Sequence, residues 1–202
     1  MLMMRWVVMD GIDGSGKSTL AHWVKERYEA EGESVLVRVH PSPTWIGRGA
    51  RKALEGEGKV MRLIATIFFI LDVLDSLRRM RRDSRTHQTI VYVRYIMATA
   101  YLPASLAPLG YDFFAKLLPI PRRLVLVDVD PIIAHQRITE RQHNKEMFED
   151  VSSLEHVRQK VLMLARRGGW KIVDNSRSED ESRRQLLMAL EEWDSSPDLS
   201  NS

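Results

Sequence analysis

Residues 11–18 of the chain read Gly11-Ile12-Asp13-Gly14-Ser15-Gly16-Lys17-Ser18, which fits the pattern G-x-x-x-x-G-K-[ST]. The three glycines let the backbone bend so that successive N–H groups point inward, where they bind phosphate oxygens. In this pattern the lysine reaches the β- and γ-phosphates of a nucleoside triphosphate, and the hydroxyl of the serine holds Mg²⁺. The stretch therefore predicts a phosphate-binding loop in which Lys17 and Ser18 take these two roles.

The sequence around this loop supplies the context that the pattern requires. Residues 5–9 form a short β-rich run before the loop, and residues 17–31 show helical spacing after it. A chance match in an unrelated loop, which is the alternative, would lack this strand and helix. We therefore expect the triphosphate to be held by Gly11, Gly14, Ser15, Gly16, Lys17, Ser18 and Thr19.

The rest of the chain alternates between strand and helix patterns. Further strands are predicted at residues 34–39, 89–93, 123–129 and 170–173, and helices at residues 60–82, from 131, 152–167 and 179–193. Residues 96–121 contain four prolines, so any helices there are short or broken. This alternation predicts an α/β fold of the P-loop NTPase type, with three layers: a five-stranded parallel sheet and helices on both faces. We expect one domain over residues 1–194 and a disordered tail at 195–202.

Composition excludes several classes of function. The 202 residues include 30 Lys and Arg against 27 Asp and Glu, and this net charge of +3 is too mild to indicate a nucleic-acid partner. The absence of cysteine excludes disulfides, thiolate metal sites and thiol nucleophiles. The longest apolar run, residues 63–71, falls short of the roughly 20 residues of a membrane helix, and no signal peptide is recognisable. We expect a cytoplasmic protein without a nucleic-acid or membrane partner.

Five arginines between residues 78 and 85 form a basic cluster, opposed only by Asp83. Such a cluster could attract anionic substrates. We favour the simpler interpretation of a solvated helix end, where cations interact favourably with the helix dipole.

Several further segments resemble motifs of one enzyme family. The opening V-M-D-G-I-D-G-S-G-K-S-T resembles E-G-x-D-G-x-G-K-[ST]-T, with Asp10 in place of glutamate. Later segments in the same order are F-F-I-L-D, V-R-Y, L-V-D-V-D-P, R-I-T-E-R with M-F-E, and W-K-I-V-D-N-S. Together, over nearly the whole chain, they resemble the thymidylate kinase family of nucleoside monophosphate kinases.

This resemblance implies an activity. It implies transfer of the γ-phosphoryl group of ATP, with Mg²⁺, to a nucleoside monophosphate, with dTMP to dTDP as the first candidate reaction. It also implies small-molecule nucleotides as the partners, a homodimer formed through helices such as residues 60–80, and an arginine-bearing lid at about residues 138–150.

The resemblance also assigns candidate site residues. Asp13 and Arg94 would contact the acceptor, Arg94 at its phosphate, and Phe69 would stack on its base. Asp13 as an acid that caps the loop and Phe69 as a core side chain are the alternatives.

Two further groups complete the predicted site. Arg137 and Arg141 lie four residues apart on one helix face, where a lid arginine would neutralise the transferring phosphoryl group. A solvated basic face is the alternative. The resemblance places the adenine near Asn175 and Arg177.

Some positions depart from the family pattern. Val39 and His40 stand where the family has arginine and glutamate, and Val73 and Val93 stand at an arginine and an aspartate. A valine cannot make the charge-assisted hydrogen bond of a guanidinium or carboxylate. Three alternatives therefore stay open: a kinase of the same fold with another nucleotide or nucleoside acceptor, an ATP-binding module with little phosphoryl transfer, and a nucleic-acid-associated ATPase, against which the weak net charge argues.

Two acids at the end of the fourth strand are also candidates. Asp128 or Asp130 could substitute for the aspartate missing at Val93 by contacting a Mg²⁺-bound water. We favour a structural role for both, at the end of a strand.

Overall fold

The computed structural model describes residues 4–54, 59–102, 104–141 and 150–196, and its centre is a single parallel sheet. The strand order is β2-β3-β1-β4-β5, and every neighbouring pair is parallel. The strands are β1 (Arg5–Asp10), β2 (Val35–Val39), β3 (Thr89–Val93), β4 (Arg123–Asp128) and β5 (Lys171–Asp174). The predicted five-stranded parallel sheet is therefore confirmed.

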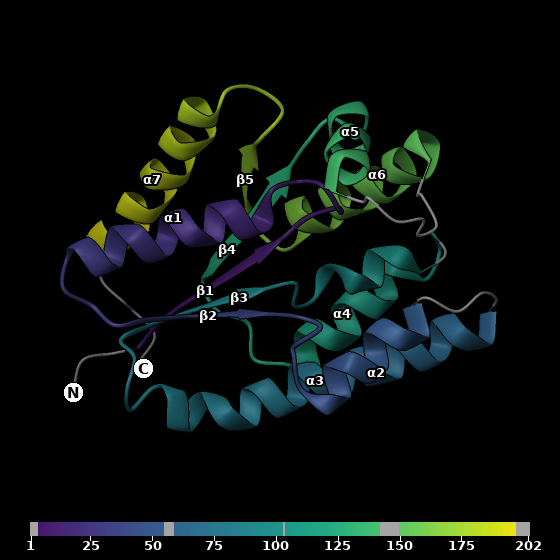
Figure 1. Cartoon of the computed structure of the whole chain (residues 1–202), viewed down its shortest axis with the longest axis horizontal. Coiled ribbons are helices and arrows are strands. Elements are labelled where there is room, and N and C mark those ends of the chain that lie inside the picture. The colour runs from purple at the N-terminus through teal and green to yellow at the C-terminus, as the bar shows by residue number, and fades with distance from the viewer. Residues whose placement is uncertain (1–3, 55–58, 103, 142–149, 197–202) are drawn as a thin grey trace.

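Helices cover both faces of this sheet, so the predicted three layers are confirmed as well (Figure 1). On one face lie α1 (Lys17–Ala30) and α7 (Glu179–Ser195). The other face is covered by α3 (Lys59–Asp83), the 3₁₀ helix η1 (Met97–Tyr101), α4 (Ala107–Leu117), α5 (Pro131–Arg141) and α6 (Val151–Arg167). The remaining helix, α2 (Trp45–Leu54), packs along α3.

The apolar runs of the strands explain this arrangement. Successive side chains of a strand point to opposite faces, so Val7 and Met9 of β1 join the core under α1 and α7, whereas Val8 joins the core on the other face. β3 is buried along its whole length. Continuous apolar strands of this kind are typical of a sheet covered on both sides.

Two details differ from the sequence-based expectations, α2 and the end of α7, whereas the short helices expected in residues 96–121 are present. The helix α2 was not predicted. The proline-rich region 96–121 contains η1 and α4, and α4 has Pro108 in its first turn, where the missing N–H has no helical partner to lose. α7 extends to Ser195, one residue into the expected tail, and residues 197–202 lie outside the described part.

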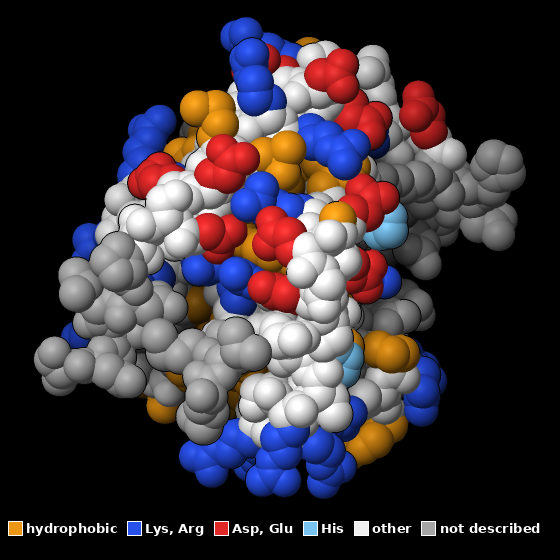
Figure 2. Space-filling view, turned by 90° about the vertical axis from the view of Figure 1, so that its left-hand side faces the viewer, with side chains coloured by type: hydrophobic (Ala, Val, Ile, Leu, Met, Phe, Trp, Pro, Cys, Tyr) orange, Lys and Arg blue, Asp and Glu red, His pale blue; other side chains and the backbone are white. Residues whose placement is uncertain are grey.

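A cluster of positive charge lies at one end of the molecule. Figure 2 shows lysine and arginine side chains gathered at the bottom of the view, where the C-terminal end of α3 lies. Arg78, Arg81, Arg82 and Arg85 are exposed there, as a solvated helix end requires. Within the described ranges, no helix is both long and apolar enough to cross a membrane.

Candidate active site

The predicted phosphate loop lies between the carboxyl end of β1 and the start of α1, at the edge where ligands bind in open parallel sheets (Figure 1). Gly14 and Gly16 have φ values of +76° and +87°, which L side chains rarely adopt. The loop also packs closely on its surroundings, because a Cβ on Gly14 would lie 2.4 Å from the carbonyl oxygen of Ala134. The bend therefore needs glycine for both conformation and space.

Lys17 lies inside the bend. Its side chain is buried, and Nζ donates to the carbonyl oxygens of Gly11, at 3.0 Å, and of Ile12. Nζ also lies 3.4 Å from Oγ of Ser15. Ser18, the next residue in the first turn of α1, is exposed. The loop thus concentrates an ammonium group and backbone amides at the N-terminus of a helix, an arrangement that attracts phosphate.

Two predicted residues from distant elements contact this loop. The side chain of Asn175, just after β5, donates from Nδ2 to the carbonyl oxygen of Ser15 at 2.7 Å. Arg137 of α5 donates to the carbonyl oxygens of Asn175, at 3.0 Å, and of Gly14, at 3.5 Å. The structure therefore brings the guanidinium of Arg137 next to the phosphate loop.

The other predicted residues of the lid and adenine regions are less constrained. Arg177 is 77% exposed along its side chain and lies 3.6 Å from Asp174. The side chain of Arg141 and residues 142–149, most of the expected lid, lie outside the described residues.

An ion pair links the residue that follows β3, Arg94, to Asp13 of the phosphate loop. The guanidinium of Arg94 forms an ion pair with the Asp13 carboxylate, and both side chains are partly exposed. Burial raises the pKa of Asp13, but the nearby charges of Arg94 and Lys17 more than offset this, so the pKa lies below its usual value. The pair therefore stays charged near neutral pH.

The backbone of Arg94 is strained. Its φ of +63° is the only positive value at a non-glycine residue among the described residues. This conformation costs an L-residue roughly 1–2 kcal/mol. Residues held in it cluster at functional sites, where their surroundings stabilise them.

Two aspartates near the loop are occupied by protein groups. Oδ2 of Asp10 accepts the backbone N–H groups of Tyr95, Ile96 and Met97 at 2.9–3.2 Å. The carboxylate of Asp128 receives two hydrogen bonds of 2.8 Å from the guanidinium of Arg158. The contact with Arg158 supports a structural role for Asp128. The sequence analysis predicted neither this contact nor those of Asp10.

The chemistry of the donor set still suits Mg²⁺. Across the described ranges, no group of three or more His, Asp or Glu side chains could hold a metal. Mg²⁺ in phosphate sites keeps several waters and takes substrate phosphates as ligands. The exposed hydroxyl of Ser18 beside the loop is sufficient to add one protein ligand to such a set.

Phe69, the residue predicted to stack on the acceptor base, lies on α3. It is partly buried on α3 and packs against the core, and its ring meets that of His40 edge-on, with centroids 6.4 Å apart. His40 in turn contacts Arg94. A stacking role and a packing role are both compatible with this position.

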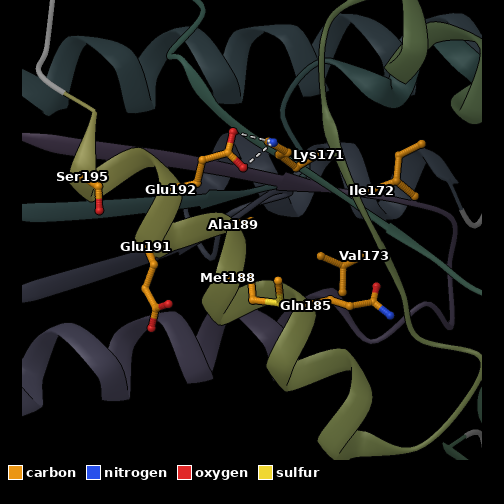
Figure 3. Close-up of a pocket in the computed structure, with 9 residues that line it drawn as sticks. All are labelled: Lys171, Ile172, Val173, Gln185, Met188, Ala189, Glu191, Glu192 and Ser195. Atoms are coloured by element: carbon orange, nitrogen blue, oxygen red, sulfur yellow. Dashed lines mark hydrogen bonds and ion pairs between the residues drawn. The ribbon is translucent and has the colours of Figure 1, made fainter.

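A separate hollow of about 530 Å³ lies between β5 and α7 (Figure 3). The ion pair of Lys171 and Glu192, at 2.7 Å, bridges it, and Met188 and Ile172 line it. No residue of the phosphate loop lines this hollow. It is therefore not part of the candidate site.

Comparison with known proteins decides the family. A family model described as thymidylate kinase matches residues 9–186, from the end of β1 to the first half of α7. The chain belongs to the thymidylate kinase family. It is 30% identical to a protein described as "probable thymidylate kinase" of Pyrobaculum calidifontis, over 92% of this chain and 95% of the relative.

Two other thymidylate kinase relatives agree. A thymidylate kinase of Leptospira borgpetersenii is 33% identical, over 76% of this chain and 77% of the relative. A protein described as "probable thymidylate kinase" of Pyrobaculum aerophilum is 31% identical, over 88% of this chain and 92% of the relative.

The departures from the thymidylate kinase motifs have clear places in the structure. Val73 on α3 and Val93 at the end of β3 are buried core residues, each 1% exposed, whereas Val39 is partly exposed at the end of β2. His40 is completely buried and hydrogen-bonded to Arg94. Hydrophobic packing has thus replaced charge at Val73 and Val93, while Arg94, Asp13 and the phosphate loop are kept.

Proposed function

We propose that this protein transfers the γ-phosphoryl group of ATP to dTMP and so forms ADP and dTDP. The observation that carries the proposal is the ion pair of Arg94, the residue that we assign to the acceptor phosphate, with Asp13 of the phosphate loop, in a chain of the thymidylate kinase family. A phosphate oxygen of dTMP attacks the γ-phosphorus, and the bond from that phosphorus to the β–γ bridging oxygen breaks.

The donor half of the reaction uses the phosphate loop. Backbone N–H groups of residues 14–18 and the ammonium of Lys17 bind the β- and γ-phosphates, and the hydroxyl of Ser18 ligates Mg²⁺. When bound, Mg²⁺ neutralises charge on the phosphate oxygens. Arg137, which already contacts the loop through Gly14, supplies further positive charge at the same place.

The acceptor half is assembled at the ends of β3 and α3. Arg94 binds the phosphate of dTMP, because a guanidinium matches two phosphate oxygens at once. Asp13 holds this guanidinium close to the loop, and Phe69 stacks on the base, an interaction worth about 1–3 kcal/mol. Reaction of this kind depends mostly on positioning and charge neutralisation.

A coupled assay for ADP tests the proposal. Purified protein with ATP and Mg²⁺ is offered dTMP, dUMP, dCMP, UMP, CMP, AMP and GMP in turn. We expect the highest kcat/KM with dTMP. Faster turnover of another acceptor would overturn the assignment of dTMP. ATP binding by calorimetry without turnover of any acceptor would show a binding module instead.

Assembly and location are part of the same proposal. We place the homodimer contact on α3, where Ile67 and Leu71 are 48% and 45% exposed. Sedimentation velocity of the wild type and of Ile67→Glu tests this, since a charge at the contact should shift a dimer to a monomer. A cytoplasmic location stays a prediction.

A further inference from the structure

His40 joins the acceptor side of the site to the core. It directly follows β2, and its side chain is completely buried. Nδ1 lies 3.0 Å from the carbonyl oxygen of Arg94, and Nε2 lies 2.9 Å from Oγ of Ser76 on α3. The rings of Tyr92 and Phe69 meet the imidazole edge-on, at 5.3 and 6.4 Å between centroids. The ring is therefore held from four sides.

The partners of the ring decide its tautomer. A carbonyl oxygen only accepts, so Nδ1 carries the proton that it donates to Arg94. Nε2 of the neutral ring then accepts from the hydroxyl of Ser76. Burial lowers the pKa of His40, and this effect outweighs the opposite effect of the charge of Asp72. The neutral form of the ring therefore dominates near pH 7.

The same contact holds a strained peptide. Arg94 has a left-handed backbone, and its own N–H donates to the carbonyl oxygen of Met9 at 2.9 Å. Its carbonyl group is held by Nδ1 of His40, while its Nη1 lies 3.5 Å from the backbone oxygen of His40. The backbone N–H of Arg94 is thus bound by β1, and its carbonyl group by the residue that follows β2. These two bonds fix the position of the Arg94 backbone, from which the side chain extends.

We propose that His40 is a positioning residue: it holds the Arg94 peptide in the left-handed conformation that aims the guanidinium at the acceptor phosphate. His40 stands where the thymidylate kinase motif has glutamate. In this chain the carbonyl group of Arg94 is therefore bound by a neutral donor. The expected changes in KM for dTMP rest on the proposed function. The expected change in the conformation of Arg94 rests only on the contacts described above.

Kinetics with single and double variants test the link. His40→Ala removes the donor, and we expect a rise of about tenfold in KM for dTMP with less than a twofold change in KM for ATP. His40→Asn keeps a donor near the position of Nδ1, so its KM for dTMP should lie close to that of the wild type. In an Arg94→Ala background, His40→Ala should change the KM for dTMP less than twofold, because the group that it positions is gone. Multiplicative effects of the two changes would overturn the proposal.

Ser76→Ala provides the matched control. It removes the other partner of the ring but leaves the donor to Arg94 in place, so we expect a KM for dTMP within about threefold of the wild type. A loss as large as that of His40→Ala would show that general packing, and not the Arg94 contact, controls the acceptor.

A spectroscopic readout separates this proposal from the proposed function. The Nε–Hε NMR resonance of Arg94, assigned by its loss in Arg94→Ala, should shift in His40→Ala and return toward its wild-type position in His40→Asn. An unchanged resonance in folded His40→Ala would overturn the positioning role, whether or not the protein phosphorylates dTMP. If wild-type protein fails to use dTMP while the resonance behaves as expected, the activity is wrong and the positioning stands.

Discussion

Arg94 and Asp13 form an ion pair across 81 residues of sequence, so the group expected to hold the acceptor is tied directly to the loop expected to hold the donor. The charges of Arg94 and Lys17 lower the pKa of the Asp13 carboxyl against the opposing effect of burial. This ion pair therefore links the two predicted halves of the site.

Lys17→Ala should slow turnover of ATP and dTMP by about two orders of magnitude or more, because it removes the ammonium that we propose neutralises the transferring phosphoryl group. Thermal unfolding followed by circular dichroism should show that the fold persists. Lys25→Ala, on an exposed face of the same helix, is the matched control and should leave turnover unchanged. Retained activity in Lys17→Ala would contradict the role of the loop.

Arg94→Ala should mainly impair use of the acceptor. A hydrogen bond to a charged group contributes about 1.5–3 kcal/mol, which corresponds to a loss of roughly 10- to 100-fold in kcat/KM for dTMP. Arg94→Lys should recover only part of it, since an ammonium lacks the planar pair of donors. Initial rates at varied dTMP and saturating ATP measure this. An effect confined to KM for ATP would show that Arg94 does not bind the acceptor.

Arg158→Ala should destabilise the protein without removing a catalytic group. It leaves the carboxylate of Asp128, only 11% exposed, without its two hydrogen bonds, at a cost of about 2 kcal/mol. Urea unfolding measures this change in the free energy of unfolding. Arg167 lies on the same helix as Arg158 and forms an exposed ion pair with Asp112 of α4. Arg167→Ala removes this pair and should change the free energy of unfolding little.

The companion variant Asp128→Asn distinguishes two roles for this acid. A structural acid predicts lower stability, with turnover close to that of the wild type at a temperature where both proteins are folded. If turnover instead fell by about two orders of magnitude while stability was unchanged, the acid would act on Mg²⁺-bound water.

The stability of the protein should fall as the pH drops from 7 toward 5, partly because of His40. Burial lowers its pKa in the folded state below the usual 6.5, so in this range the unfolded chain binds a proton that the folded chain does not. The loss should level off below the folded pKa. Asp72 of α3 opposes the shift, and Arg38 of β2 reinforces it.

Urea unfolding between pH 5 and 7.5 measures this effect. His40→Asn should show a shallower dependence on pH than the wild type, because asparagine does not titrate. Equal slopes for the two proteins would contradict the lowered pKa.

Local sequence patterns were sufficient to predict most of the fold. The strand at residues 89–93 has the predicted bounds, and the helix predicted at 60–82 is α3, Lys59–Asp83. A short apolar run and a helical spacing of apolar residues are local signals, so such elements can be recognised without tertiary information.

The helix α2 was missed because its glycines serve tertiary contacts. Gly47 and Gly49 lower helix propensity. A Cβ on Gly47 would lie 2.1 Å from the carbonyl oxygen of Ser42, and one on Gly49 would lie 2.8 Å from the ring of Phe68. Nothing local in the sequence shows that these close approaches exist.

The same distinction holds for the candidate site. The phosphate loop is contiguous and therefore visible as a pattern, and the roles assigned to its residues stay predictions. The contacts of Asp10 with Tyr95, of His40 with Arg94 and of Asp128 with Arg158 join residues that are 85, 54 and 30 positions apart. Such pairings depend on how the strands are ordered in the sheet, which a single sequence does not reveal.

The central place of β1 has a consequence for how the chain is made. Val8 pairs with Tyr92 on one side and with Leu124 on the other, so β1 gains its second neighbouring strand only after β4 has been synthesised. Closing such long loops carries a large entropic cost before any pairing compensates for it, and sheets of this kind assemble slowly. Until β4 has been synthesised, β1 lacks one of its two neighbouring strands, and incompletely paired apolar strands of this kind are prone to aggregation.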